Sequence, residues 1–240
     1  MLIEEILFKN EMNMKQLFYV PTEGTKSWQK LLADPEKHWR SGFSAKTLAH
    51  CWEDNEGFPE EFEFSFEKSG LQPEILLAIP EFKVNLDTAK RPSQNDIFVL
   101  AKDKEGLIVI MVEGKVEEPF DKTIEEWKKQ ESDGKRKRFD YLLEQLQLDK
   151  NANYDLFYYQ LFHRAVSAVK TAEKFGAKKA MMIVHSFSQT HSHFEAFKDF
   201  AKLFTKDENI EYDKIFYSKQ IGEIDLFLGW INGDKKYLEY

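Results

Sequence analysis

The stretch NDIFVLAKDKEGLIVIMVEGKV, from Asn95 to Val116, carries charged side chains at one end of an otherwise apolar segment. Asp96 stands at its start, and Glu113 and Lys115 stand near its end. Two neighbouring carboxylates are hard oxygen ligands of the kind that Mg²⁺ takes. An adjacent lysine can orient or deprotonate a water molecule and stabilise developing negative charge. These residue types indicate cation binding and water activation, provided that the fold brings them together.

The stretch is predicted to form a β-hairpin, because two apolar arms flank the polar loop KDKEG. Residues two apart share a strand face, so Glu113 and Lys115 project the same way. If Ala101 pairs with Leu107 across the loop, counting the register back places Asp96 opposite Val112 and beside Glu113, to within about one residue. At about 5 Å and an effective dielectric of about 20, two carboxylates repel by about 3 kcal/mol, so a counter-charge is expected. Lys115 supplies one positive charge, and a divalent cation would supply two.

The alternative is that the strand simply becomes polar where it leaves the core. Glu113 and Lys115 would then form an exposed ion pair worth about 0–1 kcal/mol. The two interpretations differ in burial, since an ordinary surface site requires Asp96 and Glu113 to be exposed.

Strands and helices alternate around this hairpin, which indicates a layered α/β fold. The second arm is apolar on both faces over residues 107–112, as expected of a central strand. The clearest helix is predicted at 156–175, ending at Gly176, a favourable residue just after a helix. The other predicted elements are a helix from Ser44 to about Glu53, strand-like segments at 75–79 and 81–86, hairpin arms at 96–101 and 107–116, helices within 120–132 and 135–148, a strand at 178–187, a helix at 192–204, and strands at 212–219 and 224–231.

This order of elements and charges resembles the PD-(D/E)xK nuclease superfamily. Its pattern is a helix with a glutamate, a strand with Asp, a returning strand with Glu-x-Lys, a helix and a further strand. The matching stretches are PSQNDIFVLA, VEGKVEEPF and YQLFHRAVSAVKTAEKFGAKKAMMIVHSF, so the likeness covers roughly residues 44–187. Asn95 stands where the superfamily pattern has proline before the aspartate.

The resemblance implies a restriction-endonuclease-like mixed central sheet flanked by helices, with extra helical segments at the N-terminus. It implies that Asp96 and Glu113 hold Mg²⁺ or Mn²⁺, that Lys115 is the catalytic lysine, and that Glu53 on the first core helix is an additional acid. Gln160, on the helix after the lysine strand, is a candidate for contacting metal-bound water.

Other polar residues have weaker patterns. Gln160 belongs to a stripe with His163 and Arg164 on the long helix, and the alternative is that this stripe is solvated or bonds a neighbouring helix. Glu117 shares the strand face of Glu113, so it could serve a second metal or be an exposed strand-end acid. A structural zinc is not expected, because no cysteine supports the three candidate histidines, His185, His191 and His193.

At 240 residues with 42% hydrophobic content, the chain is predicted to form one α/β domain over residues 1–240. We divide it into a nuclease-like core at about 44–187, an N-terminal arm at 1–43, and a C-terminal helix and strands at 188–240. The single Cys51 cannot form an internal disulfide, and neither a secretory signal nor a bilayer-length apolar run is evident. A cytoplasmic location without membrane association is expected.

The net charge of −8 does not favour nucleic-acid binding, because phosphate binding depends on clustered Lys and Arg. One basic block, GKRKR at 134–138, is an exception, although short charge runs are usually solvated surface. A glycine-rich phosphate loop is lacking, so an NTPase is not expected.

Two functional hypotheses follow. The first is a Mg²⁺-dependent phosphodiesterase acting on nucleic acid, with DNA favoured over RNA. The second is a catalytically inactive nuclease-fold protein that binds nucleic acid or a protein partner, since fold likeness alone does not establish activity. A homodimer is compatible with either hypothesis.

Overall fold

The computed structural model describes residues 22–55, 57–86, 92–129, 132–206 and 209–240. The first 21 residues of the predicted N-terminal arm lie outside them. The described helices are α2 (Thr25–Leu31), α3 (Pro35–His38), α4 (Ser44–Glu53), α5 (Glu60–Lys68), α6 (Ile124–Lys128), α7 (Asp133–Gln145), α8 (Tyr159–Phe175), α9 (Phe194–Ala201) and the 3₁₀ helix η1 (Lys235–Glu239). The strands are β1 (Glu74–Val84), β2 (Ser93–Asp103), β3 (Gly106–Lys115), β4 (Lys179–Ser186), β5 (Lys214–Ile221) and β6 (Ile224–Asn232).

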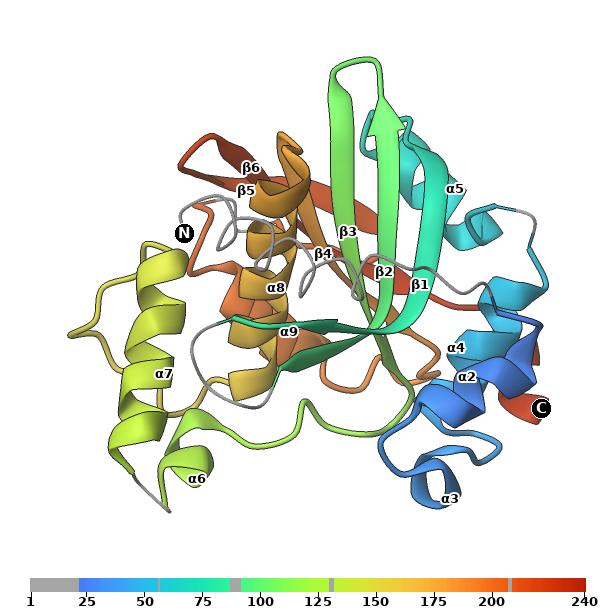
Figure 1. Ribbon diagram of the computed structural model, residues 1–240, viewed down its shortest axis with the longest axis horizontal. Helices are drawn as coiled ribbons and strands as arrows, with labels where there is room; N and C mark the ends of the chain where they lie inside the picture. Colours follow the sequence, from blue (N-terminus) through green and yellow to red (C-terminus); the bar gives the residue numbers. More distant parts are fainter. Residues whose placement is uncertain (1–21, 56, 87–91, 130–131, 207–208) are drawn as a thin grey trace, which may run out of the picture.

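The six strands form one mixed sheet in the order β1-β2-β3-β4-β6-β5 (Figure 1). The first three strands are antiparallel neighbours, β4 runs parallel to both β3 and β6, and β5 closes the far edge antiparallel to β6. The crossover from β3 to β4 passes through α6, α7 and α8, as a parallel connection requires.

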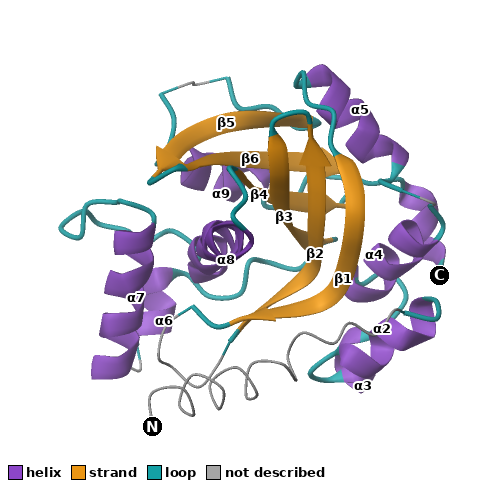
Figure 2. Cartoon of the chain, turned by 45° about the horizontal axis from the view of Figure 1, so that its top comes forward, coloured by secondary structure: helices purple, strands orange, loops and turns teal. Residues whose placement is uncertain are grey.

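Helices cover the sheet on both faces (Figure 2). One core lies between the sheet and α7, α8 and α9, and the other lies between the sheet and α2, α4, α5 and η1. Strand β3 contributes Val109 and Met111 to the first core, and Ile108, Ile110 and Val112 to the second. The predicted α/β class and the two-sided burial of this strand are therefore confirmed.

The bounds of several predicted elements differ from the observed ones. The two strand-like segments around Pro80 are one continuous strand, β1, since an edge strand tolerates proline. Helix α8 begins at Tyr159, three residues later than predicted, and ends at Gly176 in the left-handed conformation, as expected. Helix α9 begins at Phe194 after His193, which has a positive φ and no capping side chain.

The hairpin between β2 and β3 is tighter than predicted. Asp103 pairs with Gly106, so the turn holds two residues, and the Asp103 carboxylate accepts hydrogen bonds from the backbone N–H groups of Glu105 and Gly106 at 2.8 and 3.2 Å. Pairing then runs to Ile97 with Val112. The next position along the two strands therefore places Asp96 opposite Glu113 rather than opposite Val112. This is a difference of one residue from the predicted register.

Candidate functional site

The residues at the open end of the hairpin line one cavity of about 490 Å³. Asp96, Glu113 and Lys115 all line it, together with residues from β1, α3, α8 and the start of α4. Glu113 and Lys115 continue the strand face of Val109 and Met111, which packs toward α8. The predicted convergence of these three side chains is present, and we call this space the carboxylate cavity.

Glu113 is buried, with 3% of its surface exposed, and both of its oxygens accept hydrogen bonds. Oε1 accepts from Lys115 Nζ at 2.8 Å and from Gln160 Nε2 at 2.6 Å, while Oε2 accepts from Arg164 Nε at 2.5 Å. Burial acts to raise the pKa of Glu113, but Arg164 and Lys115 outweigh it and hold that pKa below its usual value. The carboxylate is therefore charged, and the interpretation of this end of the strand as ordinary surface is wrong.

Lys115 is held on three sides and is itself 5% exposed. Its Nζ donates to Glu113 Oε1 and to Gln160 Oε1, the latter at 3.1 Å, and lies 5.2 Å from the centre of the Phe120 ring. Gln160 therefore bridges the lysine and the carboxylate from α8. The polar stripe on that helix faces the site, and the solvated alternative does not hold for Gln160 and Arg164.

Asp96 lies beside this network, with a half-buried side chain. Its Oδ2 accepts a hydrogen bond from the backbone N–H of Gly114 at 2.7 Å. Burial, followed by the nearby charges of Glu113 and Glu81, raises the pKa of Asp96 well above its usual value, although Arg164 and Lys115 act in the opposite direction. Asp96 thus favours binding either a proton or a cation.

Glu81 is a third carboxylate of the site, which the sequence did not reveal. It lies on β1 between the pairs Pro80–Ile97 and Phe82–Asn95, and so faces Asp96 across the strands. Its φ of 53° is unusual for a residue other than glycine, and Gln94 Nε2 donates to its Oε2 at 2.5 Å. Burial raises the pKa of Glu81. Glu81 reaches the site only through the pairing of β1 with β2, which tertiary packing sets, so no local sequence signal places it here.

Glu53, the expected additional acid, is not part of this site. Its carboxylate accepts hydrogen bonds from Trp28 Nε1 at 2.5 Å and Thr22 Oγ1 at 2.8 Å, and Glu53 does not line the carboxylate cavity. The reason is the direction of α4, because the cavity lies at Ser44, the first residue of that helix. Glu53 is nine residues further on, roughly 14 Å along the helix axis.

Glu117 and Glu118 serve as local anchors. Glu118 accepts from the backbone N–H groups of Ser44 at 2.7 Å and Val116 at 2.8 Å, which fixes the start of α4 against the end of β3. Glu117 is exposed and accepts from Ser188 and Ser192, outside the carboxylate cavity. The exposed strand-end interpretation of Glu117 is therefore the correct one.

The three candidate zinc histidines do not meet, but His185 lies near Cys51 and Glu61 on the opposite face of the sheet. Ligand atoms of these three side chains lie within 4.8 Å of one another. Trp52 Nε1, which can only donate, lies 3.3 Å from His185 Nδ1, so the proton of a neutral ring is on Nε2, which contacts Glu61 Oε1 at 2.9 Å. Both ring nitrogens of His185 therefore already have hydrogen-bond partners. Cys51, Glu61 and His185 form a cluster whose hydrogen bonds are made within the protein.

Comparison with known proteins places most of the chain in one family. Residues 21–235 match the family described as a domain of unknown function, DUF6946. The chain belongs to this family. No curated protein and no solved structure matches it.

Among the described residues, no helix combines the length and apolar character that crossing a membrane requires.

Proposed function

We propose that this DUF6946 member is a Mg²⁺- or Mn²⁺-dependent phosphodiesterase of the PD-(D/E)xK type that acts on nucleic acid. Asp96 and Glu113 hold the cation, and Lys115 assists the attack of water. The observation that carries the proposal is the meeting of these three residues in one cavity at the end of a buried hairpin. The mixed sheet, with its antiparallel hairpin followed by a parallel strand, supports a restriction-endonuclease-like fold.

The charges lining the carboxylate cavity fit a divalent cation. Two of the three clustered carboxylates, Asp96 and Glu81, form no ion pair within the described part of the chain, whereas Glu113 has two cationic partners. No described residue donates a hydrogen bond to Oδ1 of Asp96, so this oxygen is available to a ligand. The other charged residues of the cavity wall add net negative charge, because Glu118 and Asp121 outnumber Lys37.

The protein side of the mechanism follows from the network. A bound divalent cation supplies positive charge to a phosphate oxygen and lowers the pKa of a bound water. Lys115 Nζ uses two of its donors on Glu113 and Gln160, which leaves a third to orient the attacking water or the developing oxyanion. Gln160 holds Lys115 in place, and Arg164 keeps Glu113 charged.

A cation at Asp96 must displace a proton, because burial and neighbouring carboxylates raise the pKa of that side chain. Binding should therefore release protons, and it should strengthen as the pH rises. DNA remains our preferred substrate over RNA on the resemblance to the superfamily.

The second candidate is an inactive binding module of the same fold. It is favoured by one observation: both oxygens of Glu113 are already bonded by Lys115, Gln160 and Arg164. A buried network in which every partner comes from the protein can stabilise the fold without binding a cation. In that case a cation would have no influence on the protein.

The proposal predicts metal-dependent cutting that requires Lys115. Purified protein should cleave some member of a panel of single-stranded and duplex DNA and RNA when Mg²⁺ or Mn²⁺ is added. Lys115→Ala should reduce the rate by at least about 10²-fold, as expected when a group that acts in the transition state is removed.

Lys179→Ala is the matched control. Lys179 is a buried lysine on the neighbouring strand, paired with Asp103 and Glu105 at the other end of the hairpin, so its loss disturbs a comparable ion pair without touching the cavity. Absence of cutting on every substrate, or equal loss in both variants, would rule the proposal out.

A further inference from the structure

The carboxylate cavity has a second wall, which comes from the connection between α2 and α4. The residues of this segment that line the cavity are Leu32, Ala33, Lys37, His38 and Phe43. We call them the α2–α4 wall. The segment is tied to the end of β3 where α4 begins, because Ser44 N donates to Glu118 Oε1 at 2.7 Å and Glu118 Oε2 accepts from the backbone of Val116. The wall therefore keeps a fixed place beside the carboxylates.

Lys37 gives the α2–α4 wall a positive charge that no carboxylate of the described chain neutralises. Its backbone N–H donates to Asp34 Oδ1 at 3.1 Å, at the start of α3. Its side chain is exposed and forms no ion pair or hydrogen bond within the described part of the chain. Lys115 and Arg164, which also line the cavity, are both bonded to Glu113. Among the described residues, Lys37 is therefore the lining lysine or arginine that remains available to an anionic ligand.

Phe43 adds an aromatic ring to the same wall. Its side chain lines the cavity, yet Phe43 is 41% exposed and stacks on no other ring of the described chain. Phe43 stands directly before α4 as its N-cap residue, but its side chain makes no capping hydrogen bond. Neither burial nor capping accounts for an aromatic residue at this position, and the ring is free to stack on a planar ligand.

The size of the carboxylate cavity limits what it can hold. Its volume of about 490 Å³ lies within the range of pockets that enclose one small organic ligand. A single nucleotide, with its phosphate, sugar and base, is a ligand of this class. A base within a duplex must leave the stack to enter such a pocket, at a free-energy cost that a single strand avoids.

We infer that the α2–α4 wall holds one unstacked nucleotide of a single-stranded nucleic acid, with its base on Phe43 and a phosphate at Lys37. An aromatic ring combined with a cation is the usual means of holding a single strand without reading its sequence. The inference deepens the proposed function, because the phosphodiester of this nucleotide then lies against the carboxylates. It rests on the proposed function for cleavage but not for binding.

The test is binding of a short fluorescent oligothymidylate in EDTA, measured by anisotropy at several salt concentrations. Phe43→Ala should weaken binding at least about fivefold, the lower bound for the loss of one base stack. Phe43→Trp keeps a ring to stack on and should bind within about twofold of the wild-type protein. Lys37→Gln should flatten the slope of log K against log salt by about 0.7, the value for one lost phosphate contact on a single strand.

An abasic strand of the same length separates stacking from phosphate binding. It should bind the wild-type protein about as weakly as oligothymidylate binds Phe43→Ala. On the abasic strand, Phe43→Ala should cause no further loss, because the two changes remove the same contact. Lys37→Gln should weaken binding of both strands alike.

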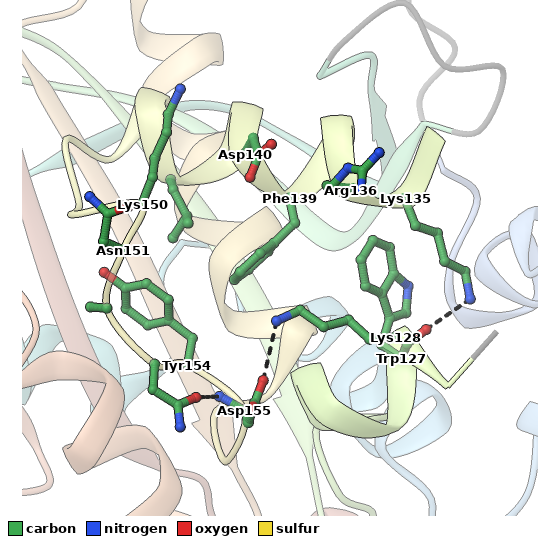
Figure 3. Close-up of a pocket in the computed structure, with 13 residues that line it drawn as sticks. Trp127, Lys128, Lys135, Arg136, Phe139, Asp140, Lys150, Asn151, Tyr154 and Asp155 are labelled. Atoms are coloured by element: carbon green, nitrogen blue, oxygen red, sulfur yellow. Dashed lines mark hydrogen bonds and ion pairs between the residues drawn. The ribbon is translucent and has the colours of Figure 1, made fainter. Parts of the chain in front are cut away.

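A cavity of similar volume over α7 supplies a matched control for Lys37 (Figure 3). Lys150 lines this cavity of about 560 Å³ and is exposed like Lys37, but it pairs with Glu144 at 2.9 Å. Phe64 on α5 is the control for Phe43, since it is 59% exposed and lies outside the carboxylate cavity. Lys150→Gln and Phe64→Ala should each bind within about twofold of the wild-type protein.

Several results would overturn the inference. These are no binding by the wild-type protein, wild-type binding by Phe43→Ala, equal losses in the control variants, and tighter binding of a duplex of equal length. Because the assay contains no metal, it also separates the two proposals. Binding that depends on Phe43 and Lys37 without any cutting in Mg²⁺ or Mn²⁺ would support the nucleotide site and reject the nuclease. Cutting that requires Lys115 but is indifferent to Phe43 and Lys37 would do the reverse.

Discussion

Glu113 lies between two buried cations, and its charge is what makes their burial tolerable. Arg164 and Lys115 both bond this carboxylate, and all three side chains are less than a tenth exposed. Removing one partner from a buried ion pair leaves an uncompensated charge, whereas removing an exposed partner does little.

Glu113→Gln should therefore lower the free energy of unfolding by about 3–5 kcal/mol. The comparison is Glu105→Gln, whose exposed carboxylate pairs with Lys179 and whose loss should change stability by less than about 1 kcal/mol. Urea denaturation measures both. A loss below 1 kcal/mol for Glu113→Gln would show that the network does not stabilise the fold.

Glu81 should behave in the opposite way. It faces Asp96, adds to the negative charge there, and lies in a strained backbone conformation. In EDTA, Glu81→Gln should raise the thermal unfolding midpoint, because it relieves carboxylate repulsion and keeps the side-chain length. The same variant should reduce the stabilisation that Mn²⁺ gives to the wild-type protein. A lower midpoint in EDTA would show that Glu81 serves structure rather than cation binding.

At the scale of elements, the site depends on a close approach of α4 to β3 at Gly114. A Cβ added there would lie 3.0 Å from Leu48 Cδ2 and 3.4 Å from Asp96 Oδ2. Gly114→Ala should therefore reduce stability by about 1–3 kcal/mol through overpacking. Gly57→Ala is the control, since nothing lies within 4 Å of its Cβ position. Equal midpoints for the two variants in thermal unfolding would show that α4 adjusts freely.

His163 on α8 contacts β2 through its Nδ1, which lies 2.8 Å from Ser93 Oγ, and its burial predicts a pH effect on stability. His163 has a folded-state pKa well below 6.5, so the unfolded chain takes up a proton first as the pH falls. Stability from the neutral ring is present above about pH 6.5 and is lost below it, by at most about 1.4 kcal/mol per pH unit. At neutral pH the free energy of unfolding of the wild-type protein should exceed that of His163→Asn. This difference should shrink as the pH falls below about 6.5. A difference between wild-type protein and His163→Asn that does not change with pH would contradict the assignment.

Elements with strong local signals were predictable. The hairpin, the central strand and α8 follow from apolar periodicity and from Gly176. The observed register differs from the predicted one by one residue, within the predicted range, because Asp103 closes a two-residue turn that the KDKEG loop does not specify uniquely. Glu81 was missed and Glu53 was wrongly expected in the site for a common reason, since the pairing of β1 and the direction of α4 are set by tertiary packing.

Across the whole molecule, the sheet brings distant parts of the chain to one end. Strands β1, β2 and β3, helix α8 and the start of α4 all contribute to the carboxylate cavity, and residues of α6, α7 and α8 line a second cavity of about 570 Å³ that shares part of its wall. The sequence indicated Asp96, Glu113 and Lys115 in the carboxylate cavity, but it did not indicate the second cavity. The block at 134–138 was interpreted as solvated surface, and only the packing of α7 beside α8 places Lys135 and Arg138 in the wall of this second cavity.

The central claim is that the clustered carboxylates bind a divalent cation, and calorimetric titration with Mn²⁺ tests it most directly. Wild-type protein and Lys179→Ala should each give the heat of a single site, and Asp96→Ala should give none. A flat titration for the wild-type protein, or an unchanged one for Asp96→Ala, would contradict the account.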